Sequence, residues 1–319
     1  MLNRRILRVK AFKALYAYAE NPDLSLKEVL ANLEASAEAT RDLYLNMLAV
    51  VPALTAEAAK RTEAARSKFN PTEEDLNPNL KFVNNGVSAL LEQDPDFQRL
   101  LEKKKFSWEQ QDAFVSKLYS NLKTREYYQA YMADEDNSLA RDAALWKDIF
   151  ANELDEDSDL DAILEDASIY WGGDELPYVL NVCISSFDEM SRTGRWNFPP
   201  LYQSDILVAR GKQNVESDRD FVRSLVTSAY GHFKEFDGLI AASVSKWALD
   251  RLYTADIVLI SLGLAEAETF PGIPVRVTIN EYVEISKYYS TPKSHGFVNG
   301  LLDRLVKERM AQGIINKSL

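Results

Sequence analysis

Cysteine and histidine are scarce in this 319-residue chain, which has Cys183 as its single cysteine and His232 and His295 as its two histidines. One cysteine excludes an intrachain disulfide, and the three residues together are too few for a Cys/His zinc site. The aspartates of residues 155–161 are not followed by the glycine and the final glutamate of a calcium-binding EF-hand loop. The sequence therefore predicts no metal site, and no cofactor is expected.

Long apolar runs are also absent. No stretch reaches the roughly 18 residues that a membrane span needs. The apolar residues near the N-terminus are interrupted by Arg8, Lys10 and Lys13, unlike those of a signal peptide. The hydrophobic share of 46% and the charged share of 27% are ordinary for a folded protein. We therefore expect no contact with a membrane and a cytoplasmic location.

No segment alternates apolar and polar residues for long enough to indicate a β-strand, so no sheet is predicted. Apolar residues recur instead at helical spacing, and the nearly all-apolar segment 250–266 is predicted to be a buried central helix. The sequence thus predicts an all-α fold. The helices expected upstream of the C-terminal stretch cover residues 3–20, 25–37, from 40 to a break or kink at Pro52, 83–91, 108–132, 140–152, 160–171, 178–190, 218–236, 236–247 and 250–266.

Negative charge is concentrated in one part of the chain, whose net charge is −12. Residues 133–175 contain fifteen acidic and two basic residues and so account for −13, which leaves +1 for the remainder. Residues 1–19 carry five basic residues and no acid, and residues 287–319 carry six basic residues against two acids. Both ends therefore suit an anionic partner, whereas the acidic run is expected to be a solvated surface.

The stretch from residue 278 indicates two amphipathic helices separated by a break at Pro292. Thr278 is expected to cap the first helix, with Glu281 as its capping-box partner, and Ser294 to cap the second. Gly300 lies inside the second helix, where glycine costs about 1 kcal/mol relative to alanine. We therefore expect another helix to approach closely at Gly300.

These residues also carry a resemblance to a known family. The pattern V-x-V-x-I-N-E-x-x-E-x-x-K at 275–287, followed by S-H-x-F-V-N-G-x-L-D at 294–303, resembles the C-terminal signature of NusB proteins. R-R-x-x-R followed by A-x-x-A-L-Y in residues 4–16 is similar to the first helix of that family. The resemblance implies an all-helical bundle that binds RNA and has no catalytic activity.

The resemblance also implies site residues. Guanidinium groups bind phosphates bidentately and stack on bases, which suits the arginine-rich first helix. Phe297 either stacks on a base or packs in the core, and His295 either contacts RNA or only caps its helix. Tyr16 is expected to contact the partner protein NusE, although an aromatic residue on a helix is more often part of a core. The residues assigned to RNA are Arg4, Arg5, Arg8, Lys13, Lys293, His295 and Phe297.

The implied organisation is discontinuous. Residues 1–50 and 205–319 would form the NusB-like RNA-binding core, and residues 51–204 would form an acidic, helical insertion of unknown role. The implied function is transcription antitermination. The chain would bind the single-stranded boxA element of ribosomal RNA leader transcripts together with NusE, a small-subunit ribosomal protein, and would join the RNA polymerase antitermination complex.

Two alternatives remain open at this point. The chain is a protein-interaction scaffold that acts through its acidic insertion and has lost RNA binding, or it is the RNA-binding part of an enzyme that modifies ribosomal RNA. Such an enzyme would need a nucleophilic cysteine and a cofactor-binding α/β domain. Cys183 lies in an apolar helix, where a buried and inert thiol is expected.

Overall fold

The computed structural model describes residues 1–155, 157–172, 174–244 and 252–317, and helices dominate these ranges. Their only extended pairing is an isolated parallel bridge between Leu2 and Tyr202, so the predicted all-α fold is confirmed. The chain divides into two compact units, which are residues 1–37 with 200–319 (unit 1) and residues 38–199 (unit 2). Among the described residues, no helix combines the length and the apolar character that a membrane span requires.

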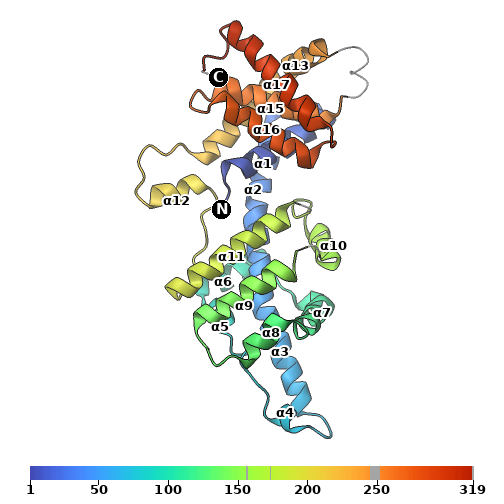
Figure 1. The fold of residues 1–319 in the computed structure, drawn as a ribbon, viewed down its shortest axis with the longest axis vertical. Coiled ribbons are helices and arrows are strands. Elements are labelled where there is room, and N and C mark those ends of the chain that lie inside the picture. Colours follow the sequence, from blue (N-terminus) through green and yellow to red (C-terminus); the bar gives the residue numbers. More distant parts are fainter. Residues whose placement is uncertain (156, 173, 245–251, 318–319) are drawn as a thin grey trace. The chain divides into compact units, whose positions relative to one another are not determined.

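Unit 1 is built around α15, Thr254–Thr269. Every residue from 258 to 267 of this helix is buried, which confirms the prediction of a buried central helix. It packs against α1, α13, α16 and α17; in Figure 1 the blue helix α1 lies beside the orange and red helices of the C-terminal part of the chain. The other helices of unit 1 are α1 Arg4–Glu20, the first half of α2 Leu26–Leu48, α12 Gln203–Ala209, α13 Asp218–Ser243, α16 Val275–Tyr289 and α17 Ser294–Ala311.

The close helix approach in unit 1 occurs at Gly263 and not at Gly300. A Cβ atom at Gly263 would lie 2.6 Å from a methyl group of Leu302, whereas a Cβ atom at Gly300 would meet nothing within 4 Å. Gly300 is exposed, so the prediction of a close contact there is wrong. The glycine that allows α15 and α17 to pack lies within the apolar run of the central helix.

Unit 2 has its own aromatic core. The ring of Trp146 lies 5.6 Å from that of Phe82, and the rings of Phe150 and Phe187 are 4.9 Å apart. Trp146 Nε1 donates to Asn85 Oδ1 at 2.8 Å, and the same oxygen caps the start of a helix. The helices of unit 2 beyond α2 are α3 Val50–Arg66, α4 Glu73–Leu76, α5 Gly86–Gln93, α6 Pro95–Lys104, η1 Glu109–Gln111, α7 Asp112–Leu122, α8 Glu126–Ala133, α9 Leu139–Asn152, α10 Ser158–Ala167 and α11 Glu175–Thr193.

The acidic run 133–175 is partly neutralised by basic residues of unit 2. The ion pairs join Asp134 to Arg141, Glu153 to Arg125 and Asp159 to Lys117, at 2.5–2.7 Å. Cys183 is free and buried, and burial raises the pKa of its thiol well above the ordinary value. This burial agrees with the expectation of an inert thiol.

Several predicted helix breaks are wrong. Residues 26–48 form the single helix α2, and residues 218–243 form the single helix α13. A break is present close to Pro52, however, because α2 ends at Leu48 and α3 begins at Val50. Pro52 itself lies in the first turn of α3, where its missing N–H leaves no helical bond unmade. Conversely, the helix predicted over residues 108–132 is divided at 123–125 between α7 and α8. The predicted boundaries at residues 247 and 250 lie outside the described residues.

The predicted caps of the last two helices are also wrong. Helix α16 begins directly after Pro274, so Thr278 lies inside it and is buried. The N-cap position of α17 is Lys293, and Ser294 is the first residue of the helix. The Ser294 hydroxyl donates to a carboxylate oxygen of Asp256 at 3.0 Å. Both hydroxyls therefore serve the interior of unit 1 and do not cap helices.

Candidate nucleic-acid interface

Helix α1 carries the arginines of the candidate interface. Asn3 caps this helix by accepting from the backbone N–H of Ile6 at 3.0 Å. No acidic residue occupies its first turn, so Arg4, Arg5 and Arg8 stand at the end where a helix dipole favours anions. This placement costs stability unless other groups neutralise the arginines, and in unit 1 carboxylates from three other segments do so.

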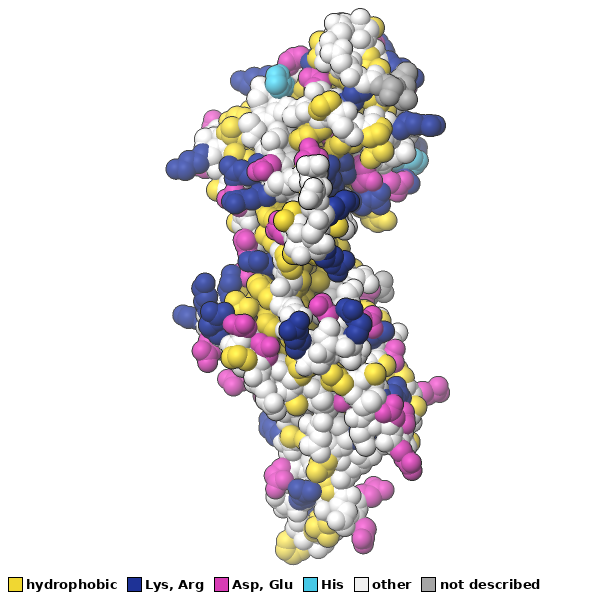
Figure 2. All heavy atoms as spheres, turned by 90° about the vertical axis from the view of Figure 1, so that its left-hand side faces the viewer, with side chains coloured by type: hydrophobic (Ala, Val, Ile, Leu, Met, Phe, Trp, Pro, Cys, Tyr) yellow, Lys and Arg dark blue, Asp and Glu magenta, His cyan; other side chains and the backbone are white. Residues whose placement is uncertain are grey.

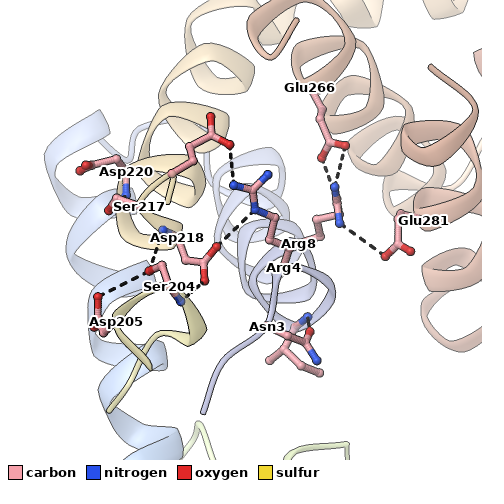
Figure 3. Close-up of polar contacts among 12 residues, drawn as sticks. Asn3, Arg4, Arg8, Ser204, Asp205, Ser217, Asp218, Asp220, Glu266 and Glu281 are labelled. Atoms are coloured by element: carbon pink, nitrogen blue, oxygen red, sulfur yellow. Dashed lines mark hydrogen bonds and ion pairs between the residues drawn. The ribbon is translucent and has the colours of Figure 1, made fainter. Parts of the chain in front are cut away.

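Arg8 lies in the interior of unit 1. Its Nε and Nη2 donate to the two carboxylate oxygens of Glu266 at 2.7 and 2.9 Å, as Figure 3 shows. Burial alone would lower the pKa of Arg8, but the hydrogen bonds and the charge of Glu266 outweigh it, and the pKa is raised. Thr278 and Tyr282 donate to the same carboxylate at 2.9 and 3.0 Å, so Glu266 is fully paired.

Arg4 points to the other side of α1, toward the start of α13. Its Nε donates to Asp218 at 3.2 Å (Figure 3), and its Nη2 donates to Glu216 at 2.5 Å. Its guanidinium lies 4.7 Å from the ring centre of Phe221. Asp218 is itself fixed, because its second oxygen accepts from the backbone N–H of Ser204 at 2.8 Å. The side chain of Arg4 keeps 31% of its surface exposed.

Arg5 is the most exposed of the three arginines, with 55% of its side-chain surface accessible. It forms a bidentate pair with Glu281 of α16, with Nε and Nη2 donating at 3.0 and 2.7 Å. The hydrogen bond from Arg5 is the main reason why the pKa of Glu281 is lowered. Glu281 was expected to be the capping-box partner of Thr278, but Thr278 lies inside α16 and Glu281 acts as the counter-ion of Arg5.

Lys13 and Tyr16 lie in the C-terminal half of α1, beside the aromatic rings of Phe12 and Tyr289. Lys13 Nζ lies 5.7 Å from the ring centre of Tyr289, the last residue of α16. Phe12 contacts both Tyr16 and Tyr289, with ring centres 5.8 and 5.1 Å apart. The basic face of α1 thus follows α16, from Glu281 beside Arg5 to Tyr289 beside Lys13. Tyr16 is at the surface, with 36% of its area exposed.

The remaining predicted residues start α17, a few positions after Tyr289. Lys293 and His295 are exposed, and neither forms an ion pair with another described residue. Phe297 is half-buried, which leaves part of its ring accessible. Helix N-termini attract anions, so these side chains stand where a phosphate is favoured.

The carboxylates that pair with the arginines were not identified from the sequence. Glu266 and Glu281 lie 258 and 276 residues from their partners, and no local pattern links such distant positions. Basic and acidic side chains lie beside one another on the face that Figure 2 shows. No group of three or more His, Cys, Asp or Glu residues among the described side chains is placed to hold a metal ion.

Comparison with known proteins identifies the family. The family model described as NusB matches residues 201–307, which lie in unit 1. The chain is 37% identical over 129 residues to the transcription antitermination protein NusB of Myxococcus xanthus (strain DK1622), covering 36% of this chain and 92% of that protein. This chain belongs to the NusB family. A second NusB, from Chloroherpeton thalassium (strain ATCC 35110 / GB-78), is 36% identical over 100 residues.

Both matches cover about a third of this chain. The aligned region is 31% of this chain and 47% of the Chloroherpeton NusB, so the chain spans about half the length of that relative. No solved structure gives a significant match. The NusB family model falls outside residues 38–199, the whole of unit 2.

Proposed function

We propose that this NusB-family chain is a transcription antitermination factor that binds single-stranded boxA RNA together with NusE and modifies elongation by RNA polymerase. The observation that carries the proposal is the exposed, bidentate guanidinium of Arg5 on a helix that also presents the partly exposed guanidinium of Arg4. A guanidinium held by a carboxylate is oriented for the phosphate that replaces it. The chain is proposed to act by binding, without catalysis.

The three arginines divide into two roles. Arg4 and Arg5 are proposed to bind RNA phosphates, which would displace the carboxylates of Glu216 and Glu281. Both guanidinium groups are accessible to solvent. Arg8 is proposed to hold α1 on α15, because its side chain is only 5% exposed. Lys13, Lys293, His295 and Phe297 are proposed to continue the RNA site along the end of α16 and the start of α17.

The protein partner is proposed to bind the aromatic group around Tyr16. Exposed aromatic side chains beside buried ones are typical anchors of protein interfaces. Tyr16 is exposed, and Phe12 behind it is buried. The NusB-like core is proposed to be residues 1–50 and 205–319, with residues 51–204 as an insertion added to it.

A direct test measures binding of a boxA RNA with and without NusE. Replacing Arg4 and Arg5 by alanine is expected to weaken binding and to flatten the log–log salt dependence by about 0.7 for each lost phosphate contact. The matched control is Arg304→Ala with Lys307→Ala, which removes two exposed cations from α17. Equal affinity of the Arg4/Arg5 variant and the native chain would refute the α1 site.

A second candidate is a scaffold that binds a basic protein through unit 2. The observation in its favour is charge, because residues 38–199 contain 31 acidic and 17 basic residues, a net of −14. Tight NusE binding without RNA affinity would favour this scaffold.

A further inference from the structure

Unit 2 contains a cavity whose side chains match the chemistry of a nucleotide. It measures about 280 Å³ and lies between the C-terminal end of α6, the following turn and α10. Its lining includes Lys105, Phe106, Trp108, Gln111, Asp166 and Trp171. Residues 104–108 supply most of one side of the cavity, and Lys103 directly precedes them in α6.

The aromatic walls of the cavity are fixed in position. Trp108 Nε1 donates to the carbonyl oxygen of Asn46 at 2.9 Å, and Trp171 Nε1 donates to that of Ala39 at 2.9 Å. Phe106 packs on Trp171 with ring centres 5.6 Å apart, and it is half-exposed, unlike the two buried tryptophans. A rigid, partly exposed ring is a suitable platform for a stacked base.

The three lysines form the longest run of basic residues in the chain, and all three are exposed. Lys104 pairs with Asp42 at 2.7 Å, whereas Lys103 and Lys105 form no ion pair with any described residue. The helix dipole accounts for cations in the last turn of α6, at Lys103 and Lys104. It does not account for Lys105, whose left-handed backbone (φ 58°, ψ 37°) favours glycine or asparagine. This backbone conformation ends α6 and leaves the Lys105 ammonium group exposed at the cavity.

The opposite side of the cavity offers hydrogen-bonding groups without partners. The side chains of Asp166 and Gln111 make no hydrogen bond or ion pair with another described residue. Carboxylate and amide groups recognise the edges of unstacked bases, and a carboxylate repels phosphate. The polar edge and the cationic edge of the cavity therefore suit different parts of one nucleotide.

We infer that this cavity binds one nucleotide of a single-stranded RNA. The base stacks on Phe106 with its edge toward Asp166 and Gln111, and the adjoining phosphates contact Lys103 and Lys105. This inference rests on the proposed function in that the chain binds RNA, but it uses none of the residues of unit 1. The net charge of −14 on unit 2 disfavours RNA binding by this unit alone, so the contact adds affinity to RNA that other groups already hold.

The test uses the full chain and a labelled single-stranded RNA of about 30 nucleotides, titrated at several salt concentrations. Lys103→Ala with Lys105→Asn is expected to lower affinity about tenfold and to flatten the salt dependence by about 0.7 for each lysine that contacts a phosphate. Phe106→Leu keeps an apolar side chain and removes the ring, so affinity should fall about fivefold or more with an unchanged salt dependence. Lys60→Ala with Lys123→Ala removes two exposed lysines elsewhere in unit 2 and should change neither quantity.

The outcomes separate this inference from the proposed function. Suppose that both cavity variants keep the native RNA affinity and salt dependence while the Arg4/Arg5 variant loses affinity. That result would overturn the inference and support the α1 site. Lost affinity in the cavity variants alone would support the inference and remove the α1 site. Saturation by free GMP or UMP at the concentration at which the RNA saturates would overturn the assignment to RNA, because a mononucleotide would then suffice. Equal melting temperatures of all variants establish that each one folds.

Discussion

The guanidinium of Arg8 donates to both carboxylate oxygens of Glu266, at 2.7 and 2.9 Å, and joins the first helix of unit 1 to its central helix. Both side chains are buried, with exposed fractions of 5% and 0%. A buried ion pair gains little over a well-packed apolar pair, but the loss of one partner leaves an uncompensated charge in the interior. The loss of either partner is therefore expected to lower the free energy of unfolding more than the intact pair raises it.

Replacing Arg8 by methionine should destabilise the protein strongly. The change leaves the Glu266 carboxylate buried with only Thr278 and Tyr282 as donors, and the expected loss is about 3–5 kcal/mol of unfolding free energy. Urea denaturation measures it. The double variant Arg8→Met with Glu266→Gln should recover part of the loss, because no buried charge remains. A loss below about 1 kcal/mol in the single variant would mean that Arg8 is not an interior contact.

The pair between Arg5 and Glu281 should make stability depend on acid pH. The pKa of Glu281 is lowered below its ordinary value of 4.5, first by the hydrogen bond from Arg5. A carboxylate with a lowered folded-state pKa contributes stability above its unfolded-state pKa and loses that contribution as the pH falls through the folded-state pKa. The native chain should therefore melt at a higher temperature than Glu281→Gln at neutral pH, and the difference should shrink below about pH 4.5. A difference that is constant down to the acid limit would contradict this ion pair.

The spacing of apolar residues predicted most helices but not the side-chain contacts between them. Residues 140–152 were expected to be a helix, and α9 spans Leu139–Asn152, because its apolar spacing is regular and Ser138 caps it. The breaks inside α2 and α13 were predicted wrongly, since no proline or helix-terminating glycine occurs there and burial decides the outcome. The interior position of Arg8 could not be read from the sequence, because its partner Glu266 lies 258 residues away.

Two glycines on packed helices should respond oppositely to the same substitution. Gly263→Ala places a methyl group 2.6 Å from Leu302, so overpacking should cost about 1–3 kcal/mol of unfolding free energy. Gly300→Ala meets nothing within 4 Å and should stabilise the protein by about 0.5–1 kcal/mol, because alanine favours the helix. Chemical denaturation of the two variants measures the difference in sign. Stabilisation by Gly263→Ala would contradict the close packing of α15 on α17.

Neutralising the counter-ion of Arg5 should strengthen RNA binding. In the free protein Glu281 occupies the guanidinium that is proposed to bind phosphate, so RNA must displace a carboxylate before it gains that contact. Glu281 is 17% exposed and also lies 3.5 Å from Arg8, but Arg8 keeps its bidentate pair with Glu266. A surface ion pair is worth roughly 0.3–1 kcal/mol, so Glu281→Gln should raise the affinity for boxA RNA about two- to fivefold. Glu284→Gln is the matched control, because Glu284 lies on the same helix and pairs with Lys287 instead. Fluorescence anisotropy at fixed salt compares the three proteins, and weaker RNA binding by Glu281→Gln would show that Glu281 positions Arg5 for RNA and does not compete with it.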